Sequence, residues 1–449
     1  MDAQTVERHA APVPRYTSYP TAPHFHAGIG EAAYSSWLNS LDPAAGLSLY
    51  LHVPFCDRLC WFCGCHTKQV RRYEPVKNYV DALESEIDLV ARHIGRVQTV
   101  EAIHLGGGSP SLLEPPEIGR LRTALGAHFA VVEDCEISLE VDPNDVTAER
   151  LAAWASFGVN RTSFGVQDFD ETVQRSINRI QSFEQTLTAV EGFRTRGVTS
   201  VNLDVLYGLP HQTAASLTRT IKRVIELAPD RVALFGYAHV PWMKKHQRLI
   251  DTSALPDASA RLEQARLGAS LLTEAGYVPV GIDHFARPAD RLAAYAKAGR
   301  VRRNFQGYTT DTASAILGFG ASTIGRLTQG YVQNVVATAD YSRMVLSGRL
   351  ATARGFQLAE DDRVRATVIE SLMCGFGFSL RELRAAFGEQ VDHIAGIAEE
   401  IWRGDEDGFT SFDGERFAVT LDGRPFVRTI ASRFDRYHAQ GNARHSAAV

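Results

Sequence analysis

Four of the six cysteines in this 449-residue chain lie within ten positions, in the segment CDRLCWFCGC. They are Cys56, Cys60, Cys63 and Cys65, and the first three have the spacing C-x3-C-x2-C. Structural zinc sites usually join two C-x2-C pairs from separate segments, and the sequence has no second pair elsewhere. Thiolates crowded into one short loop are typical of iron–sulfur clusters. The spacing therefore favours an iron–sulfur cluster over a zinc site that uses all four cysteines.

Other polar residues follow short, apolar, strand-like runs. Six such runs lie at 47–53, 101–108, 135–143, 161–168, 200–210 and 231–240. The cysteine loop follows the first run and GGGSP ends the second; the other four lead to Glu140 and Asp142, Gln167 and Asp168, Asp204, and His239. Any one of these residues alone could be a plain strand cap. Their joint placement at successive strand ends predicts an active site.

Helical patterns separate these runs. In the stretch 78–90, for example, Val80, Leu83, Ile87 and Val90 share one face of a helix. Apolar strands that alternate with helices indicate parallel pairing with helical crossovers. Six units are fewer than the eight of a closed barrel, so we expect an α/β fold with a partial (β/α)6 TIM-like barrel. A doubly wound sheet is the alternative, and a further helix over 257–275 and strand over 277–283 are expected.

The regions that flank the barrel have different patterns. Residues 1–35 include PRYTSYPTAPHF and predict an irregular arm, whereas the barrel is expected over 36–290 and a connecting segment over 291–355. Residues 356–449 show three helices, two short strands around an Asp-Gly turn and a last helix, an order that resembles a winged helix. Because this segment is not basic, we expect a smaller, mainly helical packing or lid domain rather than a DNA-binding one.

Composition excludes several classes of protein. The net charge is −5 and no basic block occurs, so we expect no nucleic-acid partner. No apolar stretch approaches the roughly eighteen residues of a membrane span and the N-terminus lacks a signal-peptide pattern, so we expect a cytoplasmic protein without membrane contact. Clustered cysteines argue against a disulfide framework. We expect the isolated Cys135 and Cys374 to be small buried hydrophobic residues.

The cysteine loop resembles that of the radical S-adenosylmethionine (SAM) enzymes. The resemblance rests on C-x3-C-x2-C after a first strand, with the aromatic Phe62 directly before the third cysteine. In that superfamily three cysteines hold a [4Fe–4S] cluster in a partial (β/α)6 barrel, and SAM binds the fourth iron. The resemblance implies that an electron from the cluster cleaves SAM to methionine and a 5′-deoxyadenosyl radical. An iron without a protein ligand is the open coordination site that metal catalysis requires.

A narrower resemblance extends over most of the chain. Nine segments are similar, in order, to the oxygen-independent coproporphyrinogen III oxidases (dehydrogenases) of haem biosynthesis: PRYTSYPTA, LYLHVPFCDRLCWFCGC, GGGSPS, GVQDF, INRIQ, DVLYGLP, YAHVP, DHFARP and NFQGYTT. The resemblance implies oxidative decarboxylation of two propionates of coproporphyrinogen III to vinyl groups, giving protoporphyrinogen IX. It also implies two SAM molecules side by side. We expect a monomer that receives electrons from a donor such as flavodoxin or ferredoxin.

The same resemblance implies roles for individual residues. Cys56, Cys60 and Cys63 would ligate the cluster and Cys65 would not. Contacts to SAM are implied for Tyr50, Phe62, Gly107, Gly108, Ser109, Glu140, Gln167, Arg179, Asp204, Ala238 and Ile324. The expected catalytic residues are Arg15, Tyr16 and Tyr50. The family commonly has threonine where Ser109 stands, and the hydroxyl is retained.

The four carboxylates of coproporphyrinogen require cationic groups in the pocket, and arginine binds carboxylates through paired hydrogen bonds. The candidates are Arg15, which we rank first, Arg161, Arg287 and Arg303. His239 and His284 lie in apolar strand-end contexts and fit structural hydrogen bonds as well as substrate contacts. We expect the arm and the C-terminal unit to keep water and oxygen from a reactive radical.

Two other functions fit a barrel with this cysteine loop. A haem-binding or haem-delivery relative would share both features but would not be expected to have PRYTSYPTA. A radical SAM enzyme that acts on another substrate, such as a methyltransferase, would cleave SAM without forming a vinyl product.

Overall fold

The computed structural model describes residues 3–9 and 11–438 of the chain. Its centre is a twelve-stranded sheet whose middle consists of six parallel strands that pair in sequence order. They are β1 (Leu47–Val53), β4 (Gln98–Gly107), β5 (Phe129–Val141), β6 (Arg161–Gln167), β7 (Ser200–Tyr207) and β8 (Arg231–Gly236). The sheet is open within the described chain, since its two edge strands do not pair. The predicted partial barrel of six strand–helix units is confirmed.

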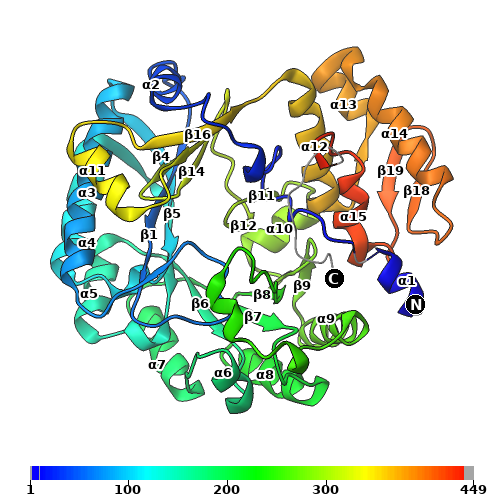
Figure 1. Cartoon of the computed structure of the whole chain (residues 1–449), viewed down its shortest axis with the longest axis horizontal. Helices are drawn as coiled ribbons and strands as arrows, with labels where there is room; N and C mark the ends of the chain where they lie inside the picture. The colour runs from blue at the N-terminus through cyan, green and yellow to red at the C-terminus, as the bar shows by residue number, and fades with distance from the viewer. Residues whose placement is uncertain (1–2, 10, 439–449) are drawn as a thin grey trace.

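Helices between the strands cover the outer face of the sheet (Figure 1). The longer ones are α3 (Glu74–Ile94), α4 (Pro115–His128), α5 (Ala148–Phe157), α7 (Phe183–Arg194), α8 (Ala214–Glu226) and α9 (Ala258–Glu274). The predicted face of α3 is fully buried, including Leu83 and Ile87. This helix ends at Gly95, whose φ of 71° provides the left-handed C-cap that glycine adopts without strain.

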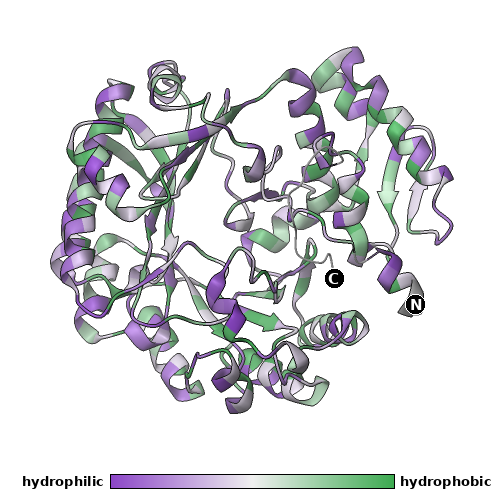
Figure 2. Cartoon of the chain, viewed as in Figure 1, coloured by the Kyte–Doolittle hydropathy of each residue, from purple (hydrophilic) through white to green (hydrophobic). Residues whose placement is uncertain are grey.

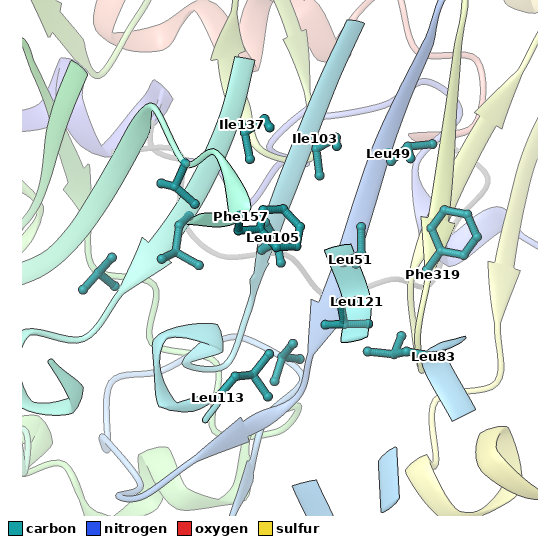
Figure 3. Packing of buried hydrophobic residues seen from close by; sticks show 14 of the residues in the cluster. Leu49, Leu51, Leu83, Ile103, Leu105, Leu113, Leu121, Ile137, Phe157 and Phe319 are labelled. Carbon is teal, nitrogen blue, oxygen red and sulfur yellow. The ribbon is translucent and has the colours of Figure 1, made fainter. Parts of the chain in front are cut away.

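Buried aliphatic side chains join the sheet to these helices. Leu49 and Leu51 lie two positions apart on β1 and therefore point to the same face of the sheet, where they belong to one core with Leu83 of α3 (Figure 3). Hydrophobic residues concentrate on the strands and the hydrophilic ones on the outer helices (Figure 2). Each fully buried leucine contributes about 1.5–3 kcal/mol. The core thus fixes the strand ends that carry the polar residues.

The segment 291–355 contributes strands to the main sheet, which the sequence did not reveal. β13 (Ala315–Phe319) pairs parallel with β1, and β14 (Ile324–Leu327), β15 (Gly330–Asn334) and β16 (Thr352–Gln357) continue antiparallel. These strands are only four to six residues long, and no crossover helix separates β13, β14 and β15. The alternation of strand and helix that marks the barrel is therefore absent here.

On the opposite edge, β10 (His284–Ala286) pairs antiparallel with both β8 and β9 (Val278–Val280). The strand expected within 277–283 is therefore present as β9. A short hairpin of β11 (Arg302–Asn304) and β12 (Gly307–Thr309) follows α10 (Arg291–Lys297). The hairpin lies between the barrel and the C-terminal domain in Figure 1.

The N-terminal arm is not wholly irregular, which corrects the prediction. It begins with the helix α1 (Ala3–His9), and a second helix, α2 (Glu31–Asn39), starts before residue 35. A seven-residue helix is too short to show apolar periodicity in the sequence. Val6 of α1 is buried in the core of the C-terminal domain, and the rest of the arm crosses from that domain to the barrel (Figure 1).

The C-terminal domain has the predicted helices and the predicted strand pair. Its elements are α12 (Glu360–Gly375), β17 (Gly377–Ser379), α13 (Leu380–Phe387), α14 (Asp392–Arg403), β18 (Thr410–Phe412), β19 (Arg416–Val419) and α15 (Val427–Ser432). The strand β17 was not predicted, and it places β19 in the middle of a three-stranded sheet. No helix in the described ranges is long and apolar enough to cross a membrane.

Candidate functional site

The cysteine loop leaves the carboxyl end of β1. Two-residue strands, β2 (Phe55–Cys56) and β3 (Lys68–Gln69), pair at its base. Cys60 is buried, Cys56 and Cys63 are half-buried, and Cys65 is exposed. Outside the loop, Cys135 is buried in the main core as predicted, whereas Cys374 is only half-buried.

Hydrogen bonds from two neighbouring segments hold the backbone of this loop. From one side, Asn178 Nδ2 donates to the Leu59 carbonyl at 2.8 Å. From the other, Gln247 Nε2 donates to the Phe62 carbonyl at 2.8 Å and His246 Nε2 donates to the Cys63 carbonyl at 2.7 Å. The loop is therefore rigidly placed by parts of the chain more than 100 residues away.

The thiols do not form a site for a single ion. Within 3–9 and 11–438, no three side chains of His, Cys, Asp or Glu are arranged to hold one metal ion. The alternative of a zinc site with four thiols requires such an arrangement. A [4Fe–4S] cluster does not, because its cysteine ligands bind different irons. The donor chemistry of Cys56, Cys60 and Cys63 fits this cluster.

Electrostatics distinguishes the thiols. Burial raises the pKa of Cys56 to about 12, although a hydrogen bond from Ser109 opposes this. A hydrogen bond from Cys65 is the main cause that lowers the pKa of Cys63. Burial raises the pKa of Cys60, and Arg179, whose Nη1 lies 3.6 Å from the Cys60 sulfur, opposes this rise. A cationic neighbour of this kind suits a thiolate ligand.

The Gly107–Gly108–Ser109 turn at the end of β4 lies directly against the cysteine loop. The Gly108 N–H donates to the Val53 carbonyl at 2.9 Å, and the Ser109 N–H donates to the Phe55 carbonyl at 2.8 Å. A Cβ atom on Gly108 would lie 2.5 Å from the Phe55 carbonyl oxygen, which is too close for any side chain. Gly107 has a φ of 110°, a conformation that favours glycine.

Glu140 at the end of β5 is held as a carboxylate. Its Oε2 accepts from the Gly107 N–H at 2.9 Å, and its Oε1 lies 3.2 Å from His104 Nε2. Burial raises the pKa of Glu140, but the hydrogen bonds from His104 and Gly107 outweigh burial and lower it overall. Glu140 thus presents negative charge beside the glycine turn, which suits an ammonium group.

Asp204 lies near Glu140, but inside β7 rather than at its end. We refer to Glu140, Asp204, Gln167 and Arg179 together as the polar group. It accepts hydrogen bonds from Ser163 Oγ at 3.1 Å and from Asn202 Nδ2 at 2.8 Å. Burial and the nearby charge of Glu140 raise its pKa to about 6. Asp204 is therefore a carboxyl group that can change protonation near neutral pH.

Arg179 and Gln167 come together at the end of β6. Arg179 is buried, and it donates to Asp142 Oδ2 at 3.1 Å and to the Gly165 carbonyl at 2.6 Å. Gln167 has a φ of 66°, and its side chain lies beside Gly165. Asp168, by contrast, is bonded to Thr220 and Gln212 of the scaffold and has a structural role.

The remaining residues expected to contact SAM come from β1, the segment after β8, and β14. Tyr50 of β1 stacks on His104 with ring centroids 5.6 Å apart, and its hydroxyl lies 3.0 Å from His52 Nδ1. Ala238 follows β8, and its carbonyl accepts from Gln247, the residue that also holds Phe62. Ile324 begins β14, whose neighbour β13 pairs with β1.

A cavity of about 1130 Å³ lies between the barrel rim, the arm and the C-terminal domain. Residues 236–239, from the last residue of β8 onward, line it, and the Ala238 carbonyl in this segment accepts from Gln247, which also holds Phe62 of the cysteine loop. Known ligand pockets are roughly 300–1,000 Å³, so this one suits a large ligand. Two of the predicted arginines, Arg15 and Arg303, line it as expected.

The other two predicted arginines lie elsewhere. Arg161 starts β6 at the opposite end of the barrel and pairs with Glu136 at 2.7 Å. Arg287 donates to the Pro229 carbonyl at 2.9 Å. Neither lines the cavity. Sequence reasoning missed Arg261 of α9 and Arg428 of α15, which do line it.

The aromatic and histidine candidates divide in the same way. His239 lines the cavity, whereas His284 is buried beside Asp283 with Nδ1 and Oδ1 2.7 Å apart. The Tyr16 hydroxyl donates to Asp435 at 3.0 Å, and the side chain of Tyr16 does not line the large cavity. Tyr19 is buried in the same C-terminal core. The two tyrosines thus attach the arm to the C-terminal domain.

Comparison with known proteins gives the family. A model described as the Radical SAM superfamily matches residues 50–224, and one described as the HemN C-terminal domain matches 358–426. The oxygen-independent coproporphyrinogen III oxidase of Bradyrhizobium diazoefficiens is 50% identical over 97% of both chains. That of Paracoccus denitrificans is 44% identical over 98% of this chain and 97% of its own.

A solved structure agrees over nearly the whole length. The coproporphyrinogen III oxidase HemN from Escherichia coli, described as a radical SAM enzyme, superposes with a TM-score of 0.90 at 38% identity. The match covers 97% of this chain and 99% of that one. The chain therefore belongs to the family of oxygen-independent coproporphyrinogen III oxidases.

Proposed function

We propose that this chain catalyses the oxygen-independent oxidative decarboxylation of coproporphyrinogen III to protoporphyrinogen IX. Each of two propionates loses one hydrogen atom, one CO2 and one electron, and becomes a vinyl group. The observation that carries the proposal concerns segment 236–239, which lines a large arginine-rich cavity and is linked to Phe62 of the cysteine loop through Gln247. The family membership supports the same activity.

Cys56, Cys60 and Cys63 would hold the [4Fe–4S] cluster. When bound, the cluster and SAM supply one-electron reduction and the 5′-deoxyadenosyl radical that abstracts the hydrogen atom. The backbone of the loop is held by Asn178 and Gln247, which supports a defined position for these three residues. Cys65 is the exposed cysteine of the loop and is left out of the ligand set.

The polar group at the rim would hold SAM. Glu140 offers a carboxylate to the amino group, and Gly107 and Gly108 allow the backbone to approach closely. The other contacts we propose are from Tyr50, Phe62, Ser109, Gln167, Arg179, Asp204, Ala238 and Ile324. A second SAM molecule beside the first is part of the proposal, and the size of the adjoining cavity supports it.

The arm and the C-terminal domain close the cavity from the side opposite the barrel. Arg15 enters from the arm, and its Nη2 donates to the Gly236 carbonyl at 3.3 Å. Exclusion of water and oxygen protects a radical intermediate. We propose Arg15 and Tyr50 as residues at the substrate, whereas the bond of Tyr16 to Asp435 supports a role for Tyr16 in docking the arm.

We also propose that the enzyme acts as a monomer in the cytoplasm and takes electrons from a small carrier such as flavodoxin or ferredoxin. We retain the division at residues 35, 290 and 355 as a proposal for its domains. The strands β13–β16 give the third of these segments a place in the barrel sheet.

The test is an anaerobic reconstitution with iron, sulfide, SAM, a reductant and coproporphyrinogen III. After oxidation of the products, we expect first the porphyrin that retains three propionates and then protoporphyrin. An intact cluster that gives no vinyl product would overturn the proposal. Tight haem binding without decarboxylation would indicate the haem-binding alternative. Cleavage of SAM without a vinyl product would indicate a radical SAM enzyme that acts on another substrate.

A further inference from the structure

The large cavity is basic although the protein as a whole is acidic. Six arginines line it against three carboxylates, whereas the chain has a net charge of −5. Four of the arginines come from separate parts of the molecule: Arg15 of the arm, Arg261 of α9, Arg303 of β11 and Arg428 of α15. We call these four residues the arginine cluster. Charge of one sign that gathers in a cavity indicates an anionic ligand.

The positive charges in this cluster repel one another. Burial, and then the charges of Arg15 and Arg303, lowers the pKa of Arg428 to about 10. The lining as a whole has six arginines against three carboxylates. An anionic ligand would reduce the mutual repulsion of guanidinium groups held around one cavity.

Backbone contacts aim the guanidinium groups from several sides. Arg261 Nη2 donates to the Tyr237 carbonyl at 2.9 Å, and Arg428 Nη2 donates to the Val13 carbonyl at 2.6 Å. Arg303 stacks on the ring of Tyr308 at 4.4 Å. Its Nε and Nη1 atoms are buried and have no hydrogen-bond partner among residues 3–9 and 11–438. Buried donors without a partner are rare in folded proteins unless a ligand or water binds them.

We propose that the arginine cluster recognises the number of carboxylates on the tetrapyrrole, so that the enzyme binds the four-carboxylate substrate and releases the two-carboxylate product. This inference rests on the proposed function and names the residues that give it selectivity. The reaction itself removes two negative charges as CO2. Each carboxylate lost removes a possible pair of hydrogen bonds with an arginine of the cluster, and this weakens binding of the product.

The test measures porphyrin binding to the full-length, cluster-reconstituted protein without reductant. The probes are coproporphyrin III, with four carboxylates, and protoporphyrin IX, with two, and quenching of their fluorescence reports binding. We expect coproporphyrin III to bind at least about tenfold more tightly. Arg261→Met and Arg303→Met should each weaken the binding of coproporphyrin III about 10- to 100-fold. The affinity for protoporphyrin IX should change far less.

Matched variants separate recognition from folding. Arg428→Met removes a further member of the cluster but also loosens the arm, so Arg261→Met and Arg303→Met carry the test. Arg343→Met is the control, because its side chain is 74% exposed and pairs only with Asp340 on the surface among the ion pairs of the described chain. It should leave both affinities unchanged.

The outcomes distinguish the inference from the function. Equal affinities for the two probes, or variants that weaken both equally, would overturn the role of the cluster in counting carboxylates. Strong preference for coproporphyrin III, lost in the variants, supports it. If that preference is present but the anaerobic assay gives no vinyl product, the proposed function fails while the recognition of carboxylates stands.

Discussion

The buried carboxyl group of Glu86 predicts an unusual dependence of stability on pH. Glu86 lies on α3 with 1% of its surface exposed. It accepts hydrogen bonds from the Gly320 N–H at 2.6 Å, Tyr341 at 2.7 Å and Asn334 at 2.7 Å, which tie α3 to the start of the β13–β14 connection and to α11 (Thr338–Leu346). Burial raises its pKa to about 7 despite these three bonds.

The sign of the effect follows from proton binding. Between the ordinary pKa of a glutamate, near 4.5, and about 7, the folded chain holds a proton at Glu86 that the unfolded chain has lost. Stability therefore falls as the pH rises through this window. At about 1.4 kcal/mol per pH unit, the loss attributable to Glu86 between pH 5 and pH 8 is about 2–3 kcal/mol.

The assay is urea unfolding of the chain between pH 5 and pH 8, followed by tryptophan fluorescence. Wild type and Glu86→Gln are compared, since the amide cannot titrate, and exposed Glu133→Gln is the control. The difference in free energy of unfolding between wild type and Glu86→Gln should shift by about 2–3 kcal/mol over this range. Parallel pH profiles for the two proteins would show that Glu86 ionises normally and would refute the reasoning.

Three further predictions concern the loop, the turn and the core. Cys65→Ser should retain iron after reconstitution, whereas serine at Cys56, Cys60 or Cys63 should abolish the cluster absorbance; iron loss in Cys65→Ser would mean that the ligand set is different. Gly108→Ala should weaken SAM binding more than tenfold by calorimetry, because its Cβ meets backbone atoms of Phe55 at 2.5 and 2.7 Å; unchanged affinity would contradict this close approach. Trp154→Ala leaves a cavity at a fully buried position and should lower the free energy of unfolding in urea by about 3–5 kcal/mol. A decrease below about 1 kcal/mol would contradict that packing.

The barrel and its cysteine loop could be predicted because their signals are local. Each of the six strands is an apolar run followed by a helix, and the spacing of Cys56, Cys60 and Cys63 indicates the cluster loop. The strands β13–β16 were missed because they are short and have no helical crossovers between most of them. Pairing between distant, short strands depends on the assembled sheet rather than on the segment itself.

The cavity arginines show a different limit. Arg161 begins its strand, and in a parallel barrel that position faces away from the active rim, so the sequence already contained the reason to discard it. Arg261 and Arg428 had no such signal, since each looks like an ordinary helix arginine. Their meeting depends on how the arm and the C-terminal domain pack onto the barrel.

The docking of the arm has a consequence for the order in which the molecule is made. The carbonyl of Val13 is held by Arg428, His9 lies 2.8 Å from Asp407, and Tyr16 is bonded to Asp435. These residues of the arm thus bind partners that lie more than 390 positions later in the chain. During synthesis the barrel can form before the arm has its partners, so the arm can dock over the cavity only after Asp407, Arg428 and Asp435 have been made.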